Sequence, residues 1–182
     1  KIDILSLHPA MFAPLQTSIL GRAQEEGHIQ INIIDIRNFG LGKYRQVDDT
    51  PYGGGSGMVM RADVLFDAIE SVRTEDSTVL MMDPVGEPFQ QKHARNLAEE
   101  KHLILICGHY EGIDSRVREH FVDSIFSIGD VVLPGGEVAA RVIVDATCRL
   151  LPSVLGNSDS LSTESFDNGL LEASVYTRNQ AL

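Results

Sequence analysis

The stretch His102-Leu103-Ile104-Leu105-Ile106-Cys107, which runs directly into Gly108-His109-Tyr110-Glu111-Gly112, decides the fold class of this chain. Its first part is apolar without alternation, which is typical of a central strand in a parallel sheet whose faces are both covered by helices. The glycines of the second part allow a tight turn and let the backbone approach a ligand closely. We therefore expect a buried strand that ends in a binding loop, because ligands of open α/β sheets bind beyond the carboxyl ends of the strands.

Predicted strands and helices alternate on both sides of this stretch. Apolar runs predict strands at residues 2–7, 29–36, 78–82 and 124–128. Amphipathic spacing predicts a short helix that starts near Asp114 and longer helices at residues 11–26, 62–72, 90–101 and 138–151. A polar loop at residues 37–57 separates the second strand from the next helix. The pattern predicts an α/β fold with a mostly parallel sheet and flanking helices.

The chain has 182 residues and a formal net charge of −11, from 15 basic and 26 acidic residues. This balance argues against a general DNA-coating protein and a polybasic membrane binder, so we expect neither DNA nor a membrane as a partner. No apolar run approaches the ~18 residues of a membrane helix. A nucleic-acid enzyme with local basic residues stays compatible with the charge. Arg37, Lys43 and Arg45 form the clearest basic cluster, which suits phosphate contacts but equally suits solvated loop charges.

Cys107 and Cys148 both lie in apolar surroundings and are predicted to be buried free thiols of a cytosolic protein. Neither stands at metal-ligand spacing from a second cysteine or a histidine, so we expect no structural zinc and assign no metal ligands. The first five residues lack the layout of a signal peptide, and Lys1 in place of a starting Met indicates that this end is trimmed. We expect a cytoplasmic protein.

Three loops that follow predicted strands are the candidate ligand-binding segments, at residues 83–86, 108–112 and 129–137. In the third, apolar residues alternate with glycines, so that a flat ring can lie between aliphatic side chains and contact backbone groups, as in an adenine pocket. The glycine run 53–57 is not a Walker A loop, because no Lys-Ser/Thr follows it and no strand directly precedes it. We expect it to be a flexible hinge or a lid over a large substrate.

Taken together, several segments resemble one known family, the bacterial tRNA (guanine-N1)-methyltransferases of the TrmD type, in the SPOUT superfamily. The segments lie in the family's order at residues 47–55, 108–114, 127–137, 154–157, 169–172 and 176–178. The resemblance implies that the α/β domain carries a C-terminal deep trefoil knot. It assigns residues 1–160 to a domain that binds S-adenosyl-L-methionine (SAM). It assigns residues 161–182 to a linker or the start of a C-terminal tRNA-binding domain that is missing from this chain.

The activity implied by the resemblance is transfer of the methyl group of SAM to N1 of the guanosine immediately 3′ of the tRNA anticodon, position 37. Family members are homodimers with the active site at the subunit interface. They are also reported to use Mg2+, for which this sequence indicates no site. The residues that match the family's SAM contacts are Asp83, Pro84, Val85, Gly108, Tyr110, Glu111, Gly112, Ile128, Gly129, Asp130, Val131, Val132, Leu133 and Gly135.

Methylation at guanine N1 requires removal of the N1 proton, which suits a carboxylate, and stabilisation of the charge that grows on O6, which suits an arginine. By resemblance, the arginine is Arg149 and the base is Glu164, which would act on the SAM of the partner subunit. Arg149 also suits a second role, complementing the dipole at the end of a helix. Glu164 stands where the family carries Asp and is one methylene longer, and Asp159 and Asp167 are the alternatives for the base.

Two positions depart from the family pattern, and two other functions stay open. Val131 stands where many members carry Tyr and Ala139 where many carry Pro, so we expect a looser pocket wall and weaker SAM binding. Asp48 and Asp49 fall in a loop that the family uses near the target base. The alternative functions are a SPOUT methyltransferase that acts on the ribose 2′-hydroxyl of RNA, and a non-catalytic dimeric module that binds SAM or RNA.

Overall fold

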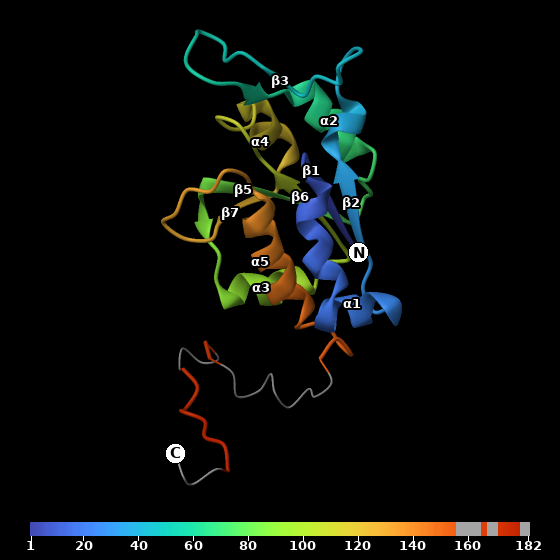
Figure 1. Cartoon of the computed structure of the whole chain (residues 1–182), viewed down its shortest axis with the longest axis vertical. Helices are drawn as coiled ribbons and strands as arrows, with labels where there is room; N and C mark the ends of the chain where they lie inside the picture. Colours follow the sequence, from blue (N-terminus) through green and yellow to red (C-terminus); the bar gives the residue numbers. More distant parts are fainter. Residues whose placement is uncertain (156–164, 167–170, 179–182) are drawn as a thin grey trace.

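The computed structural model describes residues 1–155, 165–166 and 171–178, and its core is a five-stranded sheet (Figure 1). The strand order is β2-β1-β6-β5-β7, and every neighbouring pair is parallel. Because β6 is the central strand, the prediction for residues 102–107 is confirmed, and so is the parallel α/β class. The strands are β1 (Ile2–Ser6), β2 (Ile31–Asp35), β5 (Ser77–Pro88), β6 (His102–Cys107) and β7 (Ser124–Ser127).

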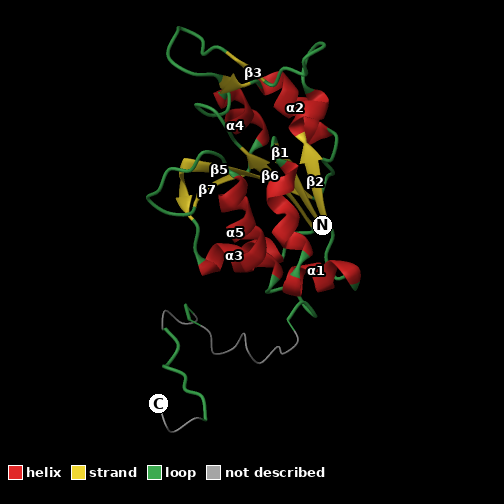
Figure 2. Cartoon of the chain, viewed as in Figure 1, coloured by secondary structure: helices red, strands yellow, loops and turns green. Residues whose placement is uncertain are grey.

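Helices cover both faces of the sheet, which gives the molecule three layers (Figure 2). One face is packed by α1 (Ser18–Glu25), α3 (Gln91–Ala98) and α5 (Glu137–Cys148). The other face is packed by α2 (Ala62–Glu70) and α4 (Ser115–Phe121). Except for α1, these helices match the predicted ones, with ends that differ by a few residues.

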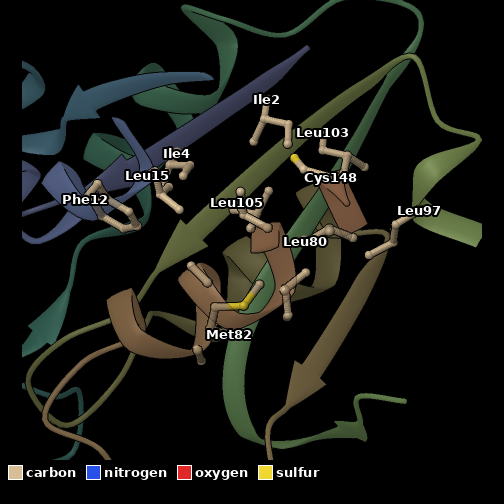
Figure 3. Close-up of a cluster of buried hydrophobic side chains, with 14 of the residues drawn as sticks. Ile2, Ile4, Phe12, Leu15, Leu80, Met82, Leu97, Leu103, Leu105 and Cys148 are labelled. Carbon is tan, nitrogen blue, oxygen red and sulfur yellow. The ribbon is translucent and has the colours of Figure 1, made fainter. Parts of the chain in front are cut away.

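The side chains of β6 alternate between the two cores. Leu103 and Leu105 belong to the cluster under α1, α3 and α5, whereas Ile104 and Ile106 belong to the cluster under α2 and α4. Figure 3 shows the first cluster, in which the β6 leucines share a core with Cys148 of α5. A fully buried Leu or Ile stabilises the fold by about 1.5–3 kcal/mol. Packing on both faces therefore explains why this strand is apolar without alternation.

Both cysteines are buried free thiols, as predicted. Burial raises the pKa of the Cys148 thiol to about 12. Burial also raises the pKa of Cys107 well above its ordinary value, and the nearby Glu137 carboxylate adds to this shift. Since the thiolate is the reactive form of cysteine, neither residue acts as a nucleophile at neutral pH.

The prediction of one helix over residues 11–26 is wrong. The structure has a 3-10 helix, η1 (Pro9–Gln16), followed by the separate helix α1. Pro14 lies inside η1 and has no N–H to continue an α-helical ladder. The break falls at Thr17, which is extended, and Ser18, whose φ is 56°.

Two predicted loops also contain strand structure. The polar loop 37–57 includes η2 (Ile36–Phe39) and β3 (Asp48–Asp49), which pairs antiparallel with β4 (Val59–Met60). The strand expected to stop at residue 82 continues to the end of β5, with a register shift between Met82 and Glu87. Residues 83–86 are therefore a bulge inside β5 rather than a loop after it. No helix in the described part of the chain is long and apolar enough to span a membrane.

Candidate active site

The three predicted ligand loops meet at the carboxyl edge of the sheet and enclose a cavity of about 390 Å³, called here the loop cavity. Every residue that the sequence matched to a SAM contact lines this cavity, except Gly129 and Asp130. Ala139, one of the departures from the family pattern, lines it too. The lining residues that the sequence analysis did not single out are Met82, His109, Ile113, Phe126, Ser127, Pro134 and Gly136.

The loop after β6 turns back over the sheet through two left-handed backbone conformations. Tyr110 has a φ of 60° and Gly112 a φ of 136°. The left-handed region costs a non-glycine residue roughly 1–2 kcal/mol, so the loop needs support. β4 and the residue before it provide that support: the N–H of Glu111 donates to the carbonyl of Met58 at 3.0 Å, and the N–H of Met60 donates to the carbonyl of Gly112 at 2.9 Å.

Two glycines let the third loop pass directly over the ends of β5 and β6. A Cβ atom on Gly136 would lie 2.8 Å from the Cα of Cys107, and one on Gly135 would collide with the His109 ring. The N–H of Gly136 donates to the carbonyl of Gly108 at 2.9 Å, which joins the second and third loops. Any larger residue would push α5 away from the sheet and open the cavity.

The walls of the loop cavity combine aliphatic side chains, glycine backbone and carboxylates. Ile128 and Leu133 pack against the core, whereas Val131 is 54% exposed. Asp83 and Glu111 place carboxylates at the cavity, and Asp83 also accepts a hydrogen bond from the N–H of Val85 at 3.0 Å. Such a set suits a ligand with a flat ring, hydroxyl groups and a positive charge.

A second, larger hollow of about 820 Å³ adjoins the loop cavity and shares Glu111, Gly112 and Ile113 with it. Arg61 crosses this hollow and contacts Asp49 at 2.8 Å and Asp63 at 2.7 Å. The Arg61 guanidinium lowers the pKa of the Asp63 carboxyl through its hydrogen bonds. Asp49, which is predicted to lie near the target base, therefore lines a charged hollow beside the loop cavity.

The basic cluster sits on and beside a tight hairpin, which we call the basic hairpin (residues 41–46). Leu41 and Gln46 form an antiparallel bridge, and Arg45 has a φ of 50°. Tyr44 at the tip is 87% exposed, with the Nζ atom of Lys43 6.0 Å from its ring centroid. Among the residues that the structure describes, Arg37, Lys43 and Arg45 make no ion pair with an acidic side chain.

Arg149, the arginine expected to carry part of the chemistry, does not line the loop cavity of its own chain. Arg149 is the C-cap residue of α5, at the end opposite the cavity. A rise of 1.5 Å per residue puts it about 20 Å from Gly136. Glu164 and the alternative bases Asp159 and Asp167 lie outside the described residues. In the described ranges, no group of three His, Cys, Asp or Glu side chains is arranged to hold a metal ion.

Comparison with known proteins gives a consistent result along the chain. Residues 1–182 match the family described as tRNA (guanine-1)-methyltransferase TrmD. A tRNA (guanine-N(1)-)-methyltransferase of Carboxydothermus hydrogenoformans is 54% identical, with 98% of this chain and 71% of that protein aligned. The enzymes of the same name from Pelotomaculum thermopropionicum and Listeria welshimeri are 54% and 49% identical, with 73% and 75% of their lengths covered.

Proposed function

Since this chain belongs to the tRNA (guanine-1)-methyltransferase family TrmD, we propose that it transfers the methyl group of SAM to N1 of guanosine 37 in tRNA, immediately 3′ of the anticodon. The observation that carries the proposal is the loop cavity, because three segments that match the family, two loops and the bulge of β5, enclose it at the carboxyl edge of the sheet. This edge is where open α/β sheets bind their ligands.

The residues around the loop cavity fit SAM. Ile128 and Leu133 offer aliphatic surfaces for an adenine ring, and Gly135 and Gly136 let the third loop lie directly against His109 and the end of β6. The carboxylates of Asp83 and Glu111 suit ribose hydroxyls or a cationic group. When bound, SAM supplies an electrophilic methyl group on a positively charged sulfur. The role of the cavity is to hold that methyl group in place and exclude water from it.

The catalytic roles that we propose are a proton acceptor and a charge stabiliser. Glu164 takes the N1 proton of guanine, which leaves N1 with a free lone pair. Arg149 donates hydrogen bonds to guanine O6, where negative charge grows as the proton leaves. Glu164 has the chemistry of the family's aspartate, and its extra methylene changes only its reach.

The distance between Arg149 and the loop cavity supports an active site shared between two subunits. A span of about 20 Å is too long for an arginine side chain to cross. In a two-fold homodimer, the end of α5 of one subunit can lie against the loop cavity of the other. We propose that Arg149 and Glu164 both act in trans, so that the dimer is required for activity.

The basic hairpin is our candidate for contact with tRNA phosphates. Lys43 and Arg45 have no acidic partner among the described residues, although acidic residues outnumber basic ones in the chain. Exposed cations without an acidic partner are available to neutralise phosphates. The neighbouring hollow with Asp49 and Arg61 adjoins the loop cavity and is our candidate for the nucleotides around the target base.

Further features of the family belong to the same proposal. We propose a deep trefoil knot in the C-terminal part of the α/β domain, and we assign residues 1–160 to the SAM-binding domain and residues 161–182 to a linker toward the tRNA-binding part of the family. We propose a cytoplasmic location, which suits two buried free thiols. Mg2+ has no step in this scheme.

Titration of SAM into the protein by calorimetry tests the cavity, and Glu164→Gln tests the base. We expect saturable binding at one site per subunit. Glu164→Gln should abolish methyl transfer and leave the SAM Kd unchanged, because the amide cannot accept the N1 proton. Equal activity of the two proteins would exclude Glu164 as the base. If the unmodified chain does not bind SAM, the proposed function is wrong.

A further inference from the structure

A buried carboxylate lies directly behind the loop cavity. Glu137 is the first residue of α5 and is 1% exposed. Its Oε1 atom accepts a hydrogen bond from Ser6 Oγ at 2.6 Å, and His109 Nε2 lies 2.9 Å from Oε1 and 2.8 Å from Oε2. Every oxygen of this carboxylate therefore has a partner, and the position at a helix N-terminus further favours its negative charge.

These contacts join three segments at the point where the cavity is built. Ser6 ends β1, His109 belongs to the loop after β6, and Glu137 begins α5. His109 lines the loop cavity, whereas Glu137 does not. The His109 ring also packs against the His8 ring, with centroids 4.7 Å apart. His109 is thus held from both sides, and the next residue along the chain is the strained Tyr110.

We propose that Glu137 is a positioning residue, which holds His109 and thereby keeps the loop after β6 in the geometry that binds SAM. The proposal rests on the function proposed above. The proposal adds a residue that does not line the cavity, because Glu137 acts through His109 and does not touch the ligand. Ser6 has a supporting part, since it fixes one of the two carboxylate oxygens.

An amide does not reproduce the charge of this carboxylate. Glu137→Gln keeps the size of the side chain but removes its negative charge, so that its contacts with His109 and Ser6 are no longer charge-assisted. At least one charge-assisted hydrogen bond is lost, and the His109 ring is free to turn. Ser6→Ala removes the hydroxyl contact with Glu137 and the hydrogen bond that Ser6 Oγ accepts from the N–H of His8 at 2.9 Å, but it leaves the carboxylate and its contact with His109 in place, so its effect should be smaller.

The opposite edge of the sheet offers a matched control. Asp3 in β1 is also 1% exposed and pairs with a buried histidine, His102 Nε2, at 2.7 Å. It accepts a further hydrogen bond from Asn32 at 2.6 Å. This second carboxylate–histidine pair lies at the amino end of the strands, away from the loop cavity. Asp3→Asn therefore damages a buried pair of the same kind without touching the SAM site.

The test compares four proteins: the unmodified chain, Glu137→Gln, Ser6→Ala and Asp3→Asn. Calorimetry gives the SAM Kd, thermal unfolding gives Tm, and initial rates give KM for SAM and kcat. We expect Glu137→Gln to raise the SAM Kd and the KM for SAM about tenfold or more, because one charge-assisted hydrogen bond is lost. The kcat at saturating SAM should change little. Ser6→Ala should raise the Kd less, and Asp3→Asn should lower Tm and leave the Kd unchanged.

Two results would overturn the inference alone. One is a lower Tm for Glu137→Gln with an unchanged SAM Kd. The other is an equal rise of the Kd in Asp3→Asn, which would mean that the effect follows general destabilisation. If Glu137→Gln fails to fold, an unchanged Kd in Ser6→Ala overturns the inference. Failure of the unmodified chain to bind SAM would instead overturn the proposed function, and this inference with it.

Discussion

Arg149 ends α5 and is half-buried, far along the helix from the loop cavity of its own chain. This place fits either of two roles, because an arginine at a helix C-terminus also stabilises the helix dipole by about 0.3–1 kcal/mol. The two roles differ in what the loss of the side chain does to the rate.

Arg149→Ala should lower kcat by about 10²–10³-fold, as expected for removal of one donor to a growing oxyanion. The SAM Kd should stay unchanged, because the side chain does not line the cavity. Steady-state rates and calorimetry check both. The matched control is Arg22→Ala, which removes an arginine from the last turn of α1. Equal and small rate changes in the two variants would mean that Arg149 only stabilises the helix end and has no catalytic role.

Asp3 makes the stability of the protein depend on pH. Burial raises the pKa of its carboxyl group, but hydrogen bonds from Lys1, Asn32 and His102 together outweigh burial and hold the pKa below the ordinary value of 3.8. A carboxylate with a lowered folded-state pKa contributes stability above its ordinary pKa, and this contribution is lost as the pH falls through the folded value.

Tm should therefore fall between about pH 5 and about pH 3, and Asp3→Asn should make this fall shallower. Thermal unfolding followed by circular dichroism at several pH values measures both slopes. The unmodified protein is the reference at each pH. Identical slopes for the two proteins would show that Asp3 does not carry the pH dependence.

At the scale of elements, the positive charges of the basic hairpin should contribute to tRNA affinity and to its dependence on salt. Replacing both Lys43 and Arg45 by Ala should weaken tRNA binding and reduce the slope of log affinity against log salt concentration by about two, one for each phosphate contact. The SAM Kd should not change. Lys101→Ala is the control, because Lys101 is also exposed but is paired with Asp76 at 2.9 Å. If the slope of log affinity against log salt concentration is unchanged in the double variant, the basic hairpin does not contact tRNA.

The junction of α5 with the sheet depends on the absence of a side chain at residue 136. Gly136→Ala should destabilise the protein by about 1–3 kcal/mol, because the new Cβ meets backbone atoms of Cys107 and Gly108 that cannot move aside. It should also weaken SAM binding. Gly108→Ala is the milder comparison for stability, since its Cβ meets only the flexible end of Ile113 at 3.2 Å. Denaturant unfolding of both variants gives the two free energies, and equal losses would contradict the close fit at residue 136.

Most elements could be predicted from the sequence because their patterns are local. The central strand is apolar from Leu103 to Cys107, and α2 shows its buried face as Val64, Leu65, Ala68 and Ile69. The failures involve non-local or weak signals. Apolar spacing across residues 11–26 hides the break at Thr17 and Ser18. The pairing of β5 with β7 on both sides of the bulge depends on a partner strand far along the chain.

At the scale of the whole molecule, the sequence predicts which loops form the cavity but not what stands behind it. Glycine loops after strands point to the carboxyl edge of the sheet from topology alone. His109 and Glu137, in contrast, are 28 residues apart, and Ser6 and Glu137 are 131 residues apart. No periodicity joins them, so their contact emerges only from the folded chain.

Mixed dimers test whether the active site is shared between subunits. Arg149→Ala has an intact loop cavity, and Gly135→Val disrupts the cavity wall by colliding with the His109 ring but keeps Arg149. Each variant alone should be nearly inactive. Co-expressed in equal amounts, they should regain about a quarter of the normal activity, because half of the dimers are mixed and each mixed dimer has one complete site. No recovery would mean that Arg149 acts within its own chain or not at all.

The methylated atom of the product tests the central claim most directly. The protein is incubated with methyl-labelled SAM and two tRNAs that differ only in having guanosine or adenosine at position 37, and the digested nucleosides are identified by mass spectrometry. We predict label in 1-methylguanosine from the first tRNA and none from the second. Label in a 2′-O-methylated nucleoside, or no label in either tRNA, would contradict a guanine-N1 methyltransferase.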